Sequence, residues 1–203
     1  MNLLTTRSKS TFFITRVAML AALATILMFF ELPLPIFPSF YKIDISEVPV
    51  IIGTFTMGPI AGLCIQLIKD LLNFLTNSST GGVGQLADFA VSASFIIPAG
   101  LIYGKMKTKK ASIIAMCIGT ISASIVGTIL NYYVLLPLFA YLFKTPISVF
   151  IAFGTAIIPA VTDLKTLVIY CTLPFNIFKF TLVSLITFFV YKRLSFLLSW
   201  NKR

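Results

Sequence analysis

The sequence contains no histidine, and only 11% of its 203 residues are charged while 58% are apolar. The absence of histidine removes the commonest metal ligand and the commonest general base near neutral pH. Soluble domains carry about one quarter charged residues, so this composition excludes an ordinary soluble domain, and its apolar content excludes disorder. With a mean hydropathy of +1.01, the chain is predicted to lie in a lipid bilayer. At about 20 apolar residues per membrane-spanning helix, its length allows about six spans.

Motifs of nucleotide-driven and hydrolytic enzymes are also missing. The chain has no G-x-x-x-x-G-K-[ST] phosphate loop, so it does not itself hydrolyse ATP by that mechanism. It has neither H-E-x-x-H nor G-x-S-x-G. Its three cysteines are odd in number and lie in apolar stretches, which argues against a disulfide framework. We therefore predict no enzyme, no catalytic residues, no metal site and no resident cofactor.

Acidic residues are few, because 6 Asp and Glu stand against 16 Lys and Arg, for a net charge of +10. In a soluble protein this balance would suggest a nucleic-acid partner. Here the basic residues cluster beside apolar runs, in segments 7–16, 105–110 and 192–203. That is the positive-inside pattern of a membrane protein, so we expect the lipid bilayer as partner and no nucleic acid. The predicted location is the bacterial plasma membrane, crossed several times.

The predicted fold is all-α: an integral membrane protein with a six-transmembrane-helix bundle in a single domain, 1–203. The expected helices lie at about 12–30, 44–57, 59–75, 85–104, 111–142 and 165–192, with an outer lid loop at about 31–43. The basic segments place the N-terminus, the 105–110 loop and the C-terminus in the cytoplasm. Segment 145–162 is apolar but contains Pro146 and Pro159. A seventh span there would oppose the charge bias, so we interpret it as a re-entrant or packed outer segment.

Several polar residues fall in the outer half of the predicted bilayer. At about 1.5 Å per residue, Lys179 lies roughly 20 Å from the basic pair at 192–193, too far for its side chain to reach the cytoplasmic interface. The same arithmetic brings residues from five helices to one layer: Asp44, Glu47, Lys69, Asp70, Asn73, Asp88, Asn131 and Lys179. Ionisable residues in a membrane are costly and are candidates for a functional site.

Two interpretations of these polar residues stay open. Asn176 and Lys179 are spaced i, i+3 and share one helix face, and Pro174 loosens the backbone beside them, which favours a ligand site. Glu47 or Asp44 could instead pair with Lys69 only to hold two helices together.

Three further signals also have two interpretations each. Asn131 favours a ligand contact but could cap an interface. Phe40 and Tyr41 suit either a lid over a flat ligand or an interfacial aromatic belt. Segment 80–84, T-G-G-V-G, is more typical of a turn than of an anion site.

The motifs resemble one known family. Segments 34–49 (LPIFPSFYKIDISEVP), 57–62 (MGPIAG), 68–73 (IKDLLN), 78–89 (SSTGGVGQLADF) and 173–179 (LPFNIFK) occur in the same order in the riboflavin-specific S components of energy-coupling factor (ECF) transporters. The resemblance covers most of the chain. It implies a membrane protein that captures riboflavin from outside and works with a transmembrane coupling subunit and two ATP-binding subunits.

The resemblance also implies roles for particular residues. Asn131, Asn176 and Lys179 match positions that contact the ligand, and the 34–44 loop matches the lid. Asp88 stands where the family pattern has Asn. Ala18 and Ala22 match a small-residue surface that docks the coupling subunit. The full predicted binding set is Asn131, Asn176, Lys179, Asp88, Asn73, Glu47, Lys69, Phe40, Tyr41 and Asp44.

FMN is an alternative ligand, because its phosphate could meet Lys179, Lys69 or Lys42. Two other classes of function remain: a stand-alone secondary carrier coupled to ions through Asp70, Asp88 or Glu47, and an intramembrane enzyme. The sequence shows no inverted repeat of broken helices and no catalytic motif, which disfavours both.

Overall fold

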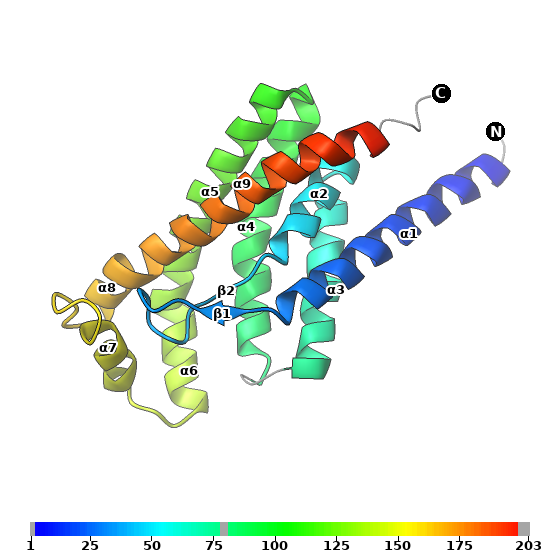
Figure 1. Cartoon of the computed structure of the whole chain (residues 1–203). Helices are drawn as coiled ribbons and strands as arrows, with labels where there is room; N and C mark the ends of the chain where they lie inside the picture. Colours follow the sequence, from blue (N-terminus) through cyan, green and yellow to red (C-terminus); the bar gives the residue numbers. More distant parts are fainter. Residues whose placement is uncertain (1–2, 78–80, 199–203) are drawn as a thin grey trace.

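The computed structural model describes residues 3–77 and 81–198, which form a bundle of long helices (Figure 1). Helix α1 begins and helix α9 ends at the same end of the bundle, and the β1–β2 hairpin and α7 lie toward the opposite end. The elements are α1 (Leu3–Met28), β1 (Leu32–Pro33), β2 (Lys42–Ile43), α2 (Glu47–Met57), α3 (Pro59–Asn77), α4 (Val83–Met106), α5 (Lys109–Leu130), η1 (Asn131–Leu135), α6 (Leu136–Leu142), α7 (Ile147–Thr155), α8 (Leu164–Leu167), η2 (Val168–Thr172) and α9 (Leu173–Leu198).

Five helical segments among the described residues are long and apolar enough to cross a membrane. They are Thr11–Met28, Pro59–Asn77, Val83–Met106, Lys109–Leu142 and Leu164–Tyr191. Helix α2 has 11 residues and therefore rises only about 16 Å. It lies inside the bundle, since residues 47–55 are all buried. The turn from α2 to α3 needs Gly58, whose φ of 99° is unfavourable for other residues, and Pro59 then starts α3.

Two helices in the described part of the chain contain π-helical turns, and each turn ends two positions before a proline. Segment η1 precedes Pro137, and η2 precedes Pro174. Proline has no N–H to donate and its ring crowds the preceding turn, so the ladder of hydrogen bonds widens to the i, i+5 pattern there. Such bulges are frequent at functional sites. The two π-helical turns contact each other, which brings both irregular segments to one region.

The loop before α2 folds back over the bundle. Its strands β1 and β2 pair antiparallel, with Leu32 opposite Ile43. The ring of Tyr41 stacks on Phe175 of α9 at a centroid distance of 5.0 Å. Tyr41, Phe175 and Leu136 of α6 share one apolar cluster. The loop is thus fixed by side chains from the two helices that carry the π-helical turns.

Segment 145–162 does not form a long helix. Helix α7 has nine residues, about 14 Å, which is too short to cross the hydrocarbon core. Helix α8 follows, and Asp163 caps it by accepting hydrogen bonds from the side chain and backbone N–H of Thr166. These hydrogen bonds lower the pKa of the exposed Asp163 carboxyl.

The main core lies where α4, α5 and α9 meet. Phe95 of α4 stacks on Phe180 of α9 at 5.3 Å. Nearer the end where α9 terminates, Phe55, Tyr103 and Tyr191 form a second group of aromatic contacts. These aromatic contacts join α2, α4 and α9, the helices that also carry polar residues in the opposite half of the bundle.

Some helix ends differ from those expected. The first helix begins earlier than expected, at Leu3, and ends at Met28, and the last helix continues past residue 192 to Leu198. A helix satisfies its own backbone groups and need not stop where the apolar run stops. Of the glycine-rich segment 80–84, Thr80 lies outside the described residues. Gly81 and Gly82 adopt positive φ angles before α4 begins, which is the geometry of a turn.

Candidate functional site

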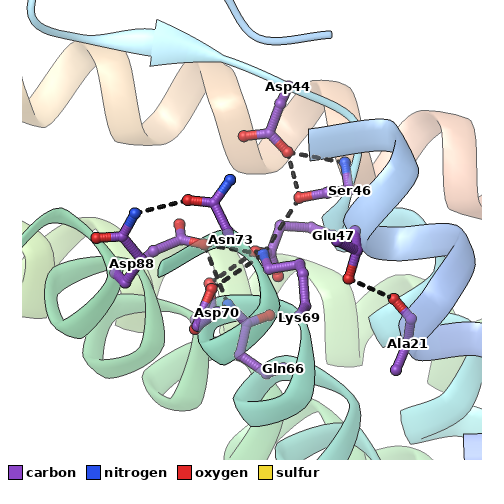
Figure 2. A network of polar contacts seen from close by, with 12 residues as sticks. Ala21, Asp44, Ser46, Glu47, Gln66, Lys69, Asp70, Asn73 and Asp88 are labelled. Carbon is purple, nitrogen blue, oxygen red and sulfur yellow. Dashed lines mark hydrogen bonds and ion pairs between the residues drawn. The ribbon is translucent and has the colours of Figure 1, made fainter. Parts of the chain in front are cut away.

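A buried lysine lies at the centre of a cluster of polar side chains (Figure 2). The Lys69 ammonium group, on α3, donates to Glu47 of α2 at 2.7 Å and to Asp88 of α4 at 2.8 Å. It also donates to the Ser46 hydroxyl at 3.2 Å and lies 3.8 Å from Asp70. Lys69 is fully buried. The structure thus joins three helices through one cation, as the helix-pairing interpretation of Lys69 and Glu47 requires.

Uncharged side chains donate further hydrogen bonds to the carboxylates, although Asp70 Oδ1 accepts none from the described residues. The amide of Gln66 donates to Asp70 at 3.0 Å and to Asp88 at 3.1 Å. The hydroxyl of Ser92, one turn after Asp88 on α4, donates to Glu47 at 3.0 Å. Because buried charges persist only when they are paired and hydrogen-bonded, these neutral donors help to keep the carboxylates in the bundle.

A second lysine extends the cluster to the last helix. Lys179 of α9 lies 3.2 Å from Asp88 and 3.3 Å from Asp44, and it is 8% exposed. Asp44, which follows β2, also accepts a hydrogen bond from the backbone N–H of Ser46 at 2.8 Å. Asp88 therefore bridges Lys69 and Lys179. Asp44 ties the end of the lid loop to the same helix face that carries Asn176.

Asn176 lies on this face with an unsatisfied amide. It is 7% exposed, and its Nδ2 atom has no hydrogen-bond partner among the described residues. Gly127 of α5 lets the amide approach: a Cβ atom at position 127 would lie 2.6 Å from Nδ2. A buried donor without a partner carries a cost of about 1–3 kcal/mol. A bound ligand with acceptor oxygens would remove that cost.

Two other predicted residues make local hydrogen bonds. Asn131, partly buried at the start of η1, donates from Nδ2 to the Gly127 carbonyl of its own helical segment at 2.8 Å. Gly127 also lies beside the Asn176 amide, and among the described residues no hydrogen bond joins Asn131 to the ion-pair cluster. Asn73 of α3 accepts a hydrogen bond from Gln85 of α4 at 2.6 Å. The expected single layer thus separates into an ion-pair cluster, which joins α2, α3, α4 and α9, and the amides of Asn73, Asn131 and Asn176, which make no ion pair.

The predicted lid residues lie over this region. Tyr41 is buried, and its hydroxyl is hydrogen-bonded to that of Thr172 in η2. Burial raises the pKa of the Tyr41 phenol, so the group stays neutral. The ring of Phe40 lies 5.7 Å from that of Phe150 in α7, edge to face. Both aromatic side chains pack on protein, and the loop lies closed on the bundle.

Three members of the cluster were not predicted: Gln66, Ser46 and Ser92. A helical spacing signal was available for two of them. Gln66, Lys69 and Asn73 recur at i, i+3 and i+7 on one face of α3, and Ser92 lies four residues after Asp88. A neutral polar side chain in an apolar helix is a weaker signal than a charge, because burying it costs less. Ser46 carried no such signal, because its position depends on the turn around Asp44.

The predicted docking residues lie on the outside of α1. Ala18 and Ala22 are exposed, whereas Val17 and Ala21 pack into the core. The neighbouring Met19 and other large apolar side chains of α1 are also exposed. The two small side chains thus lie on the exposed side of α1, and their role in docking stays a prediction.

Comparisons with known proteins place these features in a family. The family model for ECF transporter substrate-specific components matches residues 12–191. Among curated relatives, the riboflavin transporter RibU of Staphylococcus aureus is 36% identical over 179 residues, with 88% of each chain covered. The riboflavin transporter FmnP of Bacillus subtilis is 32% identical over 182 residues, covering 88% of this chain and 89% of the relative.

A solved structure has the same fold. It is that of the S component of a bacterial ECF transporter, with 34% identity and a TM-score of 0.76. The alignment covers 96% of this chain and 99% of that one.

Proposed function

We propose that this chain, which belongs to the family of ECF transporter substrate-specific components, captures riboflavin from outside the cell and delivers it inward. Its curated relatives in two bacteria are riboflavin transporters that align with 88% of the chain. Riboflavin is then the transported ligand and not a cofactor. The chain is a transporter component embedded in the membrane and not an enzyme. A stand-alone secondary carrier is not favoured by the family match.

The unpartnered amide of Asn176 is the observation that carries this proposal at the site. It lies one helical turn from Lys179 on α9, and the lid loop contacts the same helix through Tyr41 and Phe175. Riboflavin has a planar ring with carbonyl oxygens and a hydroxylated side chain, so it can supply acceptors to an amide and an ammonium group. Asn131 donates a hydrogen bond to the carbonyl of Gly127, the glycine that lies beside the Asn176 amide, so Asn131 can also take part in binding. The aromatic side chains of the lid, Phe40 and Tyr41, suit the flat ring.

Six passes through the membrane agree best with the arrangement of the bundle. Helix α2 rises only about 16 Å, so it makes the second pass together with the loop residues that precede it. The remaining five passes are the long apolar segments. An even number of passes places both termini on one side, and the basic segments assign that side to the cytoplasm. The lid loop, α7 and the amide pair then face outward, where the vitamin is captured.

Energy for uptake must come from partner proteins, because the sequence contains no phosphate loop. We infer a transmembrane coupling subunit and two ATP-binding subunits. The exposed face of Ala18 and Ala22 is the proposed docking surface, since small residues allow helices to pack closely in a membrane.

Purification of the single chain from cells grown with riboflavin tests the proposal. A folded S component for riboflavin should carry the vitamin through purification without ATP and show a flavin absorbance band. A folded protein that neither retains nor rebinds riboflavin would contradict the proposed function.

A further inference from the structure

A cavity of about 290 Å³ lies at the end of the bundle where α9 terminates, away from the lid loop (Figure 1). Residues of α4, α5 and α9 line it, together with Lys107 and Thr108 of the turn that joins α4 to α5. Small-molecule sites occupy about 300–1,000 Å³, so this volume is at their lower limit. The cavity therefore suits one compact polar group.

The lining of this cavity is rich in hydrogen-bond donors. The ammonium groups of Lys107 and Lys109 donate and never accept. The hydroxyl groups of Tyr103 and Tyr191 share one hydrogen bond of 2.8 Å, so one of the two O–H groups is left to donate to a ligand. The Thr108 hydroxyl accepts a hydrogen bond from a backbone N–H of α5, which leaves its own O–H available. No carboxylate lies among the described residues that line the cavity. A group with several acceptor oxygens fits such a lining.

The four lysines of segment 105–110 have no carboxylate partner among the described residues. The chain has six acidic side chains, all in its described part. Five of them lie in ion pairs with Lys42, Lys69 or Lys179, and Asp163 caps α8. All six are therefore engaged elsewhere, and the counter-charge for this turn has to come from outside the chain.

The position of the cavity along the helices places it at a surface of the membrane. Helices α4 and α5 both belong to segments that can cross a membrane, and the turn between them marks where one crossing ends and the next begins. Tyrosine side chains are typical of this depth. Further along α5 and α9, away from the turn, Ile113 and Leu185 are exposed and can contact acyl chains. A lipid whose headgroup filled the cavity would thus keep its tails beside apolar side chains.

We propose that this cavity binds the phosphate headgroup of an anionic phospholipid, with Lys107 and Lys109 as its charged contacts. Basic pockets between membrane-spanning helices recognise such headgroups, and hydrogen bonds between ammonium and phosphate are stronger than those between neutral groups. A zwitterionic phospholipid carries an ammonium group beside its phosphate, which the two lysines repel. The site lies apart from that of the transported ligand, and the inference does not depend on the proposed function.

Native mass spectrometry of the purified full chain in a neutral detergent tests the inference, because it counts bound lipid molecules. Phosphatidylglycerol and phosphatidylcholine with identical acyl chains are titrated separately. We expect the first phosphatidylglycerol to bind at least about tenfold more tightly than the first phosphatidylcholine, since each lysine beside an anionic lipid contributes about fivefold. In the double variant Lys107→Gln with Lys109→Gln, the ratio of the two dissociation constants should fall at least about fivefold.

Lys144→Gln with Lys165→Gln is the matched control. It removes the same charge from two exposed lysines outside the cavity, and the φ angle of Lys144 is 50°, close to the 47° of Lys107. The ratio of dissociation constants in this control should equal that of the wild type. Inorganic phosphate, added as a competitor, should leave phosphatidylglycerol bound.

Equal affinities of the wild type for the two lipids would overturn the inference, and so would an unchanged ratio in the folded double variant. Displacement of phosphatidylglycerol by inorganic phosphate would also contradict it, because the cavity would then select free phosphate from water. Melting curves show whether each variant is folded. If the double variant fails to fold, Lys109→Gln alone provides the test at a helical position, and an unchanged ratio there counts equally against the inference.

Discussion

The ammonium group of Lys179 lies 3.2 Å from the carboxylate of Asp88, and this ion pair joins the helix face that carries Asn176 to the buried cluster around Lys69. It fixes the position of Lys179 before any ligand arrives. A site whose polar groups are already held in place loses less conformational entropy on binding. The cluster is thus both a structural support for four helices and one wall of the candidate site.

The first prediction concerns the stability that Lys69 provides. Lys69→Met would leave the carboxylates of Glu47 and Asp88 without their shared cation inside the membrane. Removing one partner of a buried ion pair costs about 3–5 kcal/mol, so the free energy of unfolding should fall by that order. Thermal melting in detergent measures the effect.

Lys105→Met, which changes an exposed lysine at the end of α4, is the matched control and should melt within a degree or two of the wild type. In the double variant Lys69→Met with Glu47→Gln, part of the lost stability should return. Equal melting of Lys69→Met and the control would show that the cluster does not stabilise the bundle.

The second prediction concerns Gly127, which has no side chain to contact the ligand but lies beside the Asn176 amide. In Gly127→Ala the new methyl group would lie 2.6 Å from the Asn176 amide and push it aside. Overpacking of this kind costs about 1–3 kcal/mol, so riboflavin should bind at least about fivefold more weakly. Gly104→Ala, where an added Cβ meets no atom within 4 Å, is the matched control and should bind normally. Equal binding by both variants would separate Gly127 from the site.

The third prediction concerns the outside of α1. Ala18→Trp and Ala22→Trp should prevent close approach of a partner helix while leaving riboflavin binding by the isolated chain unchanged. Co-purification with the coupling subunit and cellular riboflavin uptake measure the effect. Ile121→Trp, on the exposed face of α5, controls for a bulky residue facing lipid. Complex formation by both alanine variants at the wild-type level would exclude this docking surface.

The composition was sufficient to predict a membrane protein. The depth of each polar residue, calculated from its position along a helix, was sufficient to predict the region of the bilayer where these residues meet. Lys179 and Asp88 were expected in the same half of the bilayer because neither lies near a predicted cytoplasmic end. Their spacing along helices of fixed rise determines their depth. Depth can therefore be obtained from a sequence without knowing which helices are neighbours.

The ion-pair partner of each charged residue could not be predicted in this way. Whether Asp44 pairs with Lys69 or with Lys179 depends on how α9 packs beside α2, and hydropathy does not specify the order of helices in a bundle. The π-helical turns were also beyond the sequence pattern: Pro137 and Pro174 indicated breaks, but a proline can kink, end or widen a helix. The unsatisfied amide of Asn176 became visible only when its surroundings were known.

Equilibrium titration of riboflavin into the purified wild type, Asn176→Ala and Lys179→Ala tests the central claim most directly. If the vitamin accepts hydrogen bonds from these two side chains, each truncation should raise the dissociation constant by about 5- to 150-fold, corresponding to about 1–3 kcal/mol. Melting curves recorded in parallel confirm that each variant is folded. Wild-type affinity in both folded variants would contradict the account, because the amide and the ammonium group would then lie outside the binding site.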